Sequence, residues 1–325
     1  CGLCHVAGSL QGSAPTPEER RRAAALNSSL LLGTDVPFGF TLGGHRSDAL
    51  LSHWPSSLSC RPADATGEAV CRRVWQSPSH ICVTLVVTTF SNHSAVWWHL
   101  ELSGTAGKSP PDDSPILEDL HPAELVLPAS AGPVLLHWSA GSSASPNDFE
   151  PSSTVLPTTE DPAGVGFMLP PELMHGRPGW LCCSGMSSDG SIGHDGIESG
   201  GALPFFRLAF ADGSTTTVAV GWTGSWQANF THLKAGGNGS TVHLTAGLTT
   251  GVFPGRSAWT GLYTRLRPGD AIRSPSIAVL FTEPVPRVEP QEQFSTAIRW
   301  RPMNMWRRLM ANHFTGNQHP PVDTP

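Results

Sequence analysis

Residues 202–226, with the sequence ALPFFRLAFADGSTTTVAVGWTGSW, decide the fold class of this chain. Apolar side chains occupy alternate positions on both sides of a turn at residues 211–214, namely Phe206, Leu208, Phe210, Val218 and Val220. A period of two is the pattern of strands that bury one face. The segment therefore predicts a β-hairpin.

The hairpin leads into a loop, residues 221–226, that is rich in glycine and tryptophan. Glycine allows a tight backbone, and the indoles of Trp222 and Trp226 offer flat apolar surfaces. This combination suits the faces of sugar rings. Burial of both indoles in a sandwich core is the alternative.

The rest of the chain agrees with an all-β fold. Only 14% of the 325 residues are charged, against about 25% in typical domains. From residue 30 to about residue 290, short apolar runs alternate with turn residues, as in a large antiparallel β-sandwich. We predict a leader arm over residues 1–29, with a short helix at residues 17–26, and the sandwich over residues 30–290.

Beyond residue 290 the pattern changes to helical spacing. Pro302 stands at a helix start, and an apolar stripe follows it: Met303, Met305, Trp306, Leu309, Met310 and Phe314. We expect residues 291–325 to form a short C-terminal helix that packs on the sheet, followed by a linker.

Several blocks occur in an order that is found in a known family. They are PFGFT (37–41) with SDALL (47–51), WWHLE (97–101) with SPILEDL (114–120), HWSAGS (137–142) with Ser145, Asp148 and Phe149, the hairpin, GDAIRSP (269–275) and WRRLM (306–310). With these blocks the chain resembles the N-terminal β-supersandwich domain of melibiase-type α-galactosidases, glycoside hydrolase family 36 and its relatives. The resemblance runs from about residue 30 to the end.

The resemblance implies a galactose-mutarotase-like supersandwich that packs on a (β/α)8 barrel of the same gene product. In the family the nucleophile is the Asp of a Lys-x-Asp strand end on that barrel. The only lysines here, Lys108 and Lys234, are not followed two residues later by Asp. The Pro-rich residues 317–325 resemble the joint where the barrel begins. We therefore expect this segment alone to be a non-catalytic domain, inactive by itself, with an oligosaccharide or glycoside as the ligand of the whole enzyme.

Two loops are the predicted sugar- or barrel-facing part, because functional groups of a sandwich come from loops at one end or from an open sheet face. One loop supplies the indoles of Trp222 and Trp226. The other supplies polar groups able to bind hydroxyls: His137, Ser145 and Asp148. The acidic pairs Glu118-Asp119, Asp112-Asp113 and Glu160-Asp161 are expected to be solvated surface rather than a pair of glycosidase carboxylates.

A secretory route is indicated by four Asn-x-Ser/Thr sequons and seven cysteines. The sequons are Asn27, Asn92, Asn229 and Asn238. The disulfide candidates are Cys60, Cys71, Cys82, Cys182 and Cys183, although all of them could instead be reduced and buried. We expect a secreted, glycosylated protein with at least one disulfide among Cys60, Cys71 and Cys82.

Other functions find less support. A free-standing secreted carbohydrate-binding or cell-surface sandwich is the main alternative. The CxxCH motif of Cys1, Cys4 and His5 matches c-type haem attachment, but the remaining chain is β-rich rather than helical, and a trimmed pair of secretory cysteines is the competing interpretation.

The 14 scattered histidines predict no metal site, and we expect no cofactor. The net charge of −6 argues against nucleic acid, and the strongest apolar run, residues 81–87, has the length of a strand and not of a membrane span.

Overall fold

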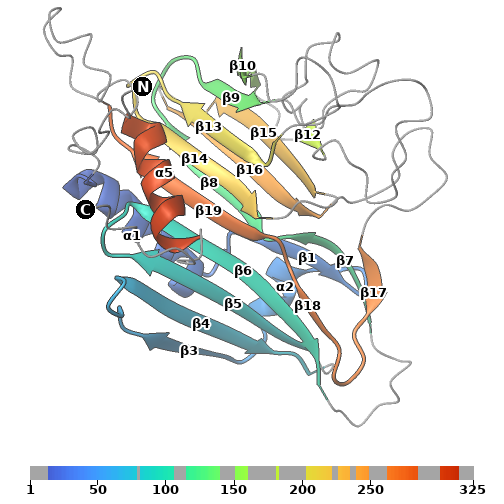
Figure 1. The fold of residues 1–325 in the computed structure, drawn as a ribbon. Coiled ribbons are helices and arrows are strands. Elements are labelled where there is room, and N and C mark those ends of the chain that lie inside the picture. Colours follow the sequence, from blue (N-terminus) through green and yellow to red (C-terminus); the bar gives the residue numbers. More distant parts are fainter. Residues whose placement is uncertain are drawn as a thin grey trace, which may run out of the picture.

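The computed structural model describes residues 14–78, 81–105, 115–139, 151–159, 181–182, 203–221, 226–234, 239–248, 262–284 and 301–314. In this part of the chain, strands predominate and form one large and two smaller sheets (Figure 1). All strand pairs are antiparallel except β11 with β15. The all-β sandwich predicted from the hairpin and the turn spacing is confirmed.

The large sheet has ten strands in the order β10-β9-β13-β14-β19-β6-β5-β4-β3, with β18 paired to β6. Its strands are β3 (Ser56–Arg61), β4 (Glu68–Gln76), β5 (Ile81–Phe90), β6 (Ala95–Gly104), β9 (Leu135–Ser139), β10 (Pro151–Val155), β13 (Phe205–Ala209), β14 (Thr215–Gly221), β18 (Ala271–Arg273) and β19 (Ser276–Thr282).

The five-stranded sheet follows the order β11-β15-β16-β8, with β12 paired to β15, and the four-stranded sheet the order β17-β7-β1-β2. Their strands are β1 (Gly39–Leu42), β2 (His45–Arg46), β7 (Ile116–His121), β8 (Ala123–Ala129), β11 (Thr158–Thr159), β12 (Leu181–Cys182), β15 (Trp226–Lys234), β16 (Ser240–Leu248) and β17 (Tyr263–Arg265). The described helices are α1 (Pro17–Leu32), α2 (Ser47–Leu51) and α5 (Arg301–His313).

The predicted hairpin is β13 with β14, in the register Phe205↔Ala219 to Ala209↔Thr215. The alternation holds in β13, where Phe206 and Leu208 are buried and Phe205 is exposed. It fails in β14, where every side chain from Thr215 to Val220 is buried. The reason is position: β14 lies between β13 and β19, with the core on one face and α5 across the other (Figure 1).

The core lies between the sheets, and most of its largest buried side chains are aromatic. The largest fully buried ones are Trp75, Trp98, Phe38, Phe40, Phe206 and Phe230. The indole N–H of Trp98 donates to the carbonyl of Pro122 at 2.6 Å, which satisfies its one polar group. Its neighbour Trp97 points to the opposite face and packs beside α5. Adjacent residues of a strand point to opposite faces, which accounts for this division of the two indoles.

Helix α1 begins with a capping box, in which the Thr16 hydroxyl accepts from the Glu19 N–H and the Glu19 carboxylate accepts from the Thr16 N–H. It is longer than the predicted helix, extends to Leu32, and buries Ala23, Leu30 and Leu31 against the core. The predicted boundary at residue 29 therefore falls within α1.

The predicted C-terminal helix is confirmed as α5. Its buried centre is Met305 and Leu309, which are fully covered and pack on Phe90, Ala95 and Leu280. Met303, which also fits the helical spacing, is 37% exposed. Helix α5 marks the face of the large sheet that is turned away from the core, and we call this face the outer face.

Candidate functional site

A row of polar side chains crosses the outer face of the large sheet beside α5. His137 of β9 lies opposite Arg207 of β13, and Ser153 of β10 lies opposite His137 on the other side. Arg207 in turn lies opposite Thr217 of β14. Side chains directly opposite in antiparallel strands are about 5 Å apart at Cβ, so these groups are neighbours.

Arg207 is half-buried, and its charge has no partner among the residues that the structure describes. The Nε atom is buried without a hydrogen-bond acceptor. Among the residues that the structure describes, no carboxylate contacts its guanidinium, and burial alone lowers the pKa of Arg207. An unsatisfied buried donor is costly, so this position invites an acceptor.

His137 is affected by the same surroundings. Burial, and then the charge of Arg207, hold the pKa of His137 below its ordinary value. The imidazole is therefore neutral near pH 7, with one ring nitrogen able to donate and the other able to accept. Such a group can bind hydroxyls.

An aromatic edge borders this row. Phe205 precedes Arg207 by two residues on the same face of β13 and is 41% exposed. Its ring meets that of Trp306 of α5 edge to face, with 5.9 Å between centroids. We call His137, Ser153, Phe205 and Arg207 together the outer patch. It combines an unpaired cation, a neutral imidazole, a hydroxyl and an aromatic face, which suits polar-ligand binding rather than catalysis.

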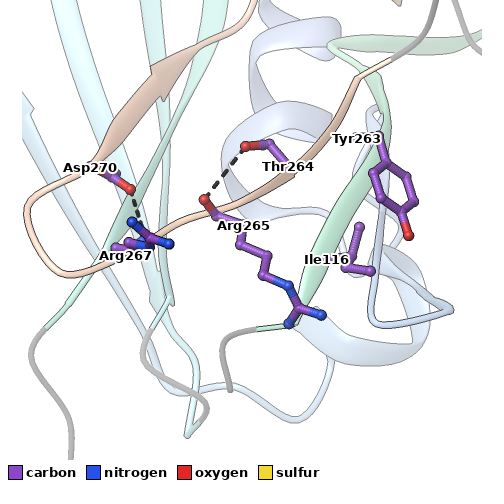
Figure 2. Close-up of a pocket in the computed structure, with 6 residues that line it drawn as sticks. All are labelled: Ile116, Tyr263, Thr264, Arg265, Arg267 and Asp270. Carbon is purple, nitrogen blue, oxygen red and sulfur yellow. Dashed lines mark hydrogen bonds between the residues drawn. The ribbon is translucent and has the colours of Figure 1, made fainter. Parts of the chain in front are cut away.

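A cavity of about 420 Å³ lies elsewhere, between β7, β17 and the turn before β18 (Figure 2). It is lined by Ile116, Tyr263, Thr264, Arg265, Arg267 and Asp270. The turn is fixed by a hydrogen bond from the Asp270 N–H to the Arg267 carbonyl at 2.9 Å, and by Gly269 at φ +93°. The Asp270 carboxylate also accepts from the Arg267 N–H at 2.8 Å. Since Tyr263, Arg265 and Arg267 all have further interactions, the outer patch is the stronger candidate.

Of the predicted sugar- or barrel-facing residues, His137 alone has a described side chain. Trp226 begins β15, where its backbone pairs with Leu248. Trp222, Ser145 and Asp148 lie outside the described residues. His137 is joined in the patch by Arg207 of the hairpin, which is not among the predicted site residues. The sequence signal that could have indicated Arg207 is a charged side chain at an outward position of a central strand.

The sequons differ in access. Asn92 is exposed in the turn between β5 and β6. Asn27 in α1 and Asn229 in β15 are partly buried, and the Oδ1 atom of each is buried without a hydrogen-bond partner. Asn238 lies outside the described residues.

Cys60 and Cys71 form a disulfide that links β3 to β4. Cys82 is a free thiol. Cys182 is in β12, with only its backbone described, and Cys183, Cys1, Cys4 and His5 lie outside the described residues. The predicted disulfide within the group from Cys60 to Cys82 is therefore present.

Glu118 and Asp119 are partly exposed in β7, and the Asp119 carboxylate accepts from the Thr41 hydroxyl at 3.1 Å. Across the described ranges, no set of three or more His, Cys, Asp or Glu side chains is arranged to hold a metal ion. Nor does any helix among the described residues have the length and apolar character to cross a membrane.

The fold and the patch define a large antiparallel β-sandwich domain with a polar, aromatic-edged sheet face. Solved structures of glycoside hydrolase family 36 are similar to it in fold. An α-galactosidase from Geobacillus stearothermophilus in complex with raffinose gives a TM-score of 0.48 at 10% identity, over 77% of this chain and 30% of its own. The galactosidase domain of an α-galactosidase–sucrose kinase gives 0.47 at 13% identity, over 77% and 30%.

An α-galactosidase from Lactobacillus brevis gives a TM-score of 0.47 at 13% identity, over 77% of this chain and 29% of its own. The chain thus spans about 30% of the length of these structures. No protein-family model and no curated protein matches its sequence.

Proposed function

We propose that this chain is the non-catalytic domain of an α-galactosidase-like glycoside hydrolase. In this proposal it packs on a (β/α)8 barrel of the same protein, and its loops line the sugar subsites. The ligand of the whole enzyme is an oligosaccharide or glycoside.

The main support for the proposal is that the sequence blocks that resemble the family form buried, hydrogen-bonded parts of the sandwich. In the block at residues 37–41, Phe38 and Phe40 are buried, and the Phe40 N–H donates to the Ser47 hydroxyl at 3.2 Å. In the block at residues 269–275, the buried Ser274 hydroxyl accepts from the Leu100 N–H at 2.9 Å. These residues fix corners of one sandwich, so the blocks support a shared scaffold rather than chance matches.

A secretory location belongs to the same proposal. The Cys60–Cys71 disulfide supports it, because disulfides persist in oxidising compartments. The exposed turn position of Asn92 is accessible to a glycosyltransferase. Treating the natively expressed protein with a glycosidase should reduce its mass, and Asn92→Gln should remove part of that change. An unchanged mass contradicts the secretory location.

The test of function compares two chains with a chromogenic α-galactoside. Residues 1–325 alone should give no turnover, because the Lys-x-Asp nucleophile motif is absent from them. A longer chain with the barrel should be active. Turnover by residues 1–325 that is abolished by changing one acidic residue within them contradicts the proposal.

The role of the loops is tested in the longer chain by Trp222→Ala and Trp226→Ala. We expect kcat/KM to fall while the melting temperature is retained. The matched control is Trp98→Ala, because that indole is fully buried and its loss should cost about 3–5 kcal/mol of stability. If Trp222→Ala and Trp226→Ala lose as much stability as Trp98→Ala, both indoles belong to the core. The proposed role of the two loops in the sugar subsites is then wrong.

A free-standing carbohydrate-binding sandwich is the second candidate, and the exposed Phe205 ring beside Arg207 and His137 favours it. In that case residues 1–325 bind sugar without any barrel. The absence of a downstream barrel in the gene would support this candidate over the first.

A further inference from the structure

We propose that the outer patch binds a carboxylate-bearing sugar, such as a hexuronate, with Arg207 as the group that receives the carboxylate. This proposal concerns the sandwich itself and does not depend on a barrel.

Arg207 carries a charge that no described residue neutralises. A guanidinium has five N–H donors in a planar fork, and here Nε is buried without an acceptor. The described residues give it no carboxylate, and the side chain opposite it on β9 is the neutral imidazole of His137. A carboxylate ligand would supply both the negative charge and two acceptors in the matching geometry.

The groups around the cation can bind hydroxyls. His137, neutral near pH 7, lies opposite Arg207, and the exposed Ser153 lies opposite His137. Both carry donors and acceptors suited to hydroxyls. A ligand that places its carboxylate on Arg207 can therefore place hydroxyl groups along β9 and β10.

An aromatic edge borders the cation. Phe205 and Arg207 are separated by two residues on one face of a strand, about 7 Å, which one sugar ring can bridge. The edge-to-face contact with Trp306 holds the Phe205 ring in place, while 41% of the residue stays exposed. The exposed ring offers an apolar surface for the C–H face of a sugar. A cation beside an aromatic face favours an acidic sugar over a free anion.

The test is isothermal titration of residues 1–325 with galacturonate, glucuronate, galactose, acetate and inorganic phosphate. We expect a Kd on the order of 1 mM for a uronate, and binding at least about tenfold weaker for galactose and acetate. Arg207→Met should weaken uronate binding at least about tenfold. Arg61→Met, in the exposed edge strand β3, should leave it unchanged.

A second measurement separates binding from folding. Because Arg207→Met removes a half-buried unpaired charge, its melting temperature should equal or exceed that of the wild type. Galacturonate should raise the melting temperature of the wild type but not of the variant. Phe205→Ala, at an exposed position, should also weaken uronate binding. Uronate binding that is absent, that survives Arg207→Met, or that acetate and phosphate reproduce overturns the proposal.

Discussion

Glu19 of α1 and Arg301 of α5 form an ion pair across 282 residues of sequence. The Glu19 side chain is fully buried, and its carboxylate also accepts from the Glu283 N–H at 2.7 Å and the Thr16 N–H at 2.8 Å. Burial by itself would raise the pKa of Glu19, but the hydrogen bonds, with Arg301 foremost, hold it below its ordinary value. One carboxylate thus joins the start of α1, the end of β19 and the start of α5.

We predict that Glu19→Gln and Arg301→Met each lower the free energy of unfolding by about 3–5 kcal/mol, since each leaves a buried partner uncompensated. The double variant should lose less than the sum of the two. Urea denaturation measures the free energy of unfolding of the two single variants and of the double variant. Glu18→Gln is the matched control, because the Glu18–Arg21 pair is exposed and should leave stability unchanged. Equal losses in Glu18→Gln and Glu19→Gln would show that the pair does not hold the helices together.

A second prediction concerns pH and the far end of α5. His93 is buried, and its ring meets that of His313 at 5.2 Å between centroids. The His313 Nδ1 atom pairs with Glu68 of β4 at 2.5 Å, and Arg308 of α5 is the other charged neighbour of His93. Burial, and then the charges of His313 and Arg308, lower the pKa of His93 to about 4.

Because the folded state resists protonation of His93, stability should be complete above about pH 6.5 and decline as the pH falls towards 4, by at most about 3 kcal/mol. Chemical denaturation at several pH values measures the decline. His93→Gln should flatten this part of the profile, whereas His45→Gln, at an exposed position of β2, should not. If the stability of His93→Gln still declines with falling pH as in the wild type, the decline comes from other titratable groups.

The third prediction tests how α5 packs. Leu309→Ala should lower the free energy of unfolding by about 2–5 kcal/mol, because the side chain is fully covered by the sheet. Met303→Ala on the same helix is the control, since Met303 is 37% exposed and should matter far less. If both variants lose the same free energy of unfolding, α5 does not pack on the sheet through the face that carries Met305 and Leu309.

The fourth prediction concerns the edge of the large sheet. Every residue of β3 is exposed, so little apolar burial holds this strand, and the Cys60–Cys71 disulfide is its main attachment besides the backbone pairing with β4. Replacing both cysteines by Ser should cost about 2–3 kcal/mol. It should also speed hydrogen exchange of the β3 amides. Cys82→Ser, which removes the free thiol of β5, should leave both measurements unchanged. Unchanged exchange in the double variant contradicts this role.

The sequence alone determined the elements whose periodicity is local. The alternation around residues 211–214 gave the β13–β14 hairpin, and the apolar spacing after Pro302 gave α5. The adjacent indoles of Trp97 and Trp98 lie on opposite faces, as the alternation of side chains along a strand requires.

Only the tertiary structure decided which elements meet. Periodicity indicates that a strand has an inner and an outer face. It does not indicate which strand pairs with it or what covers its outer face. The burial of both faces of β14 depends on α5, and the juxtaposition of His137 with Arg207 depends on a register between residues 70 positions apart. The sequence could not bring the outer patch together for this reason: its cation and its imidazole become neighbours only when β9 pairs with β13.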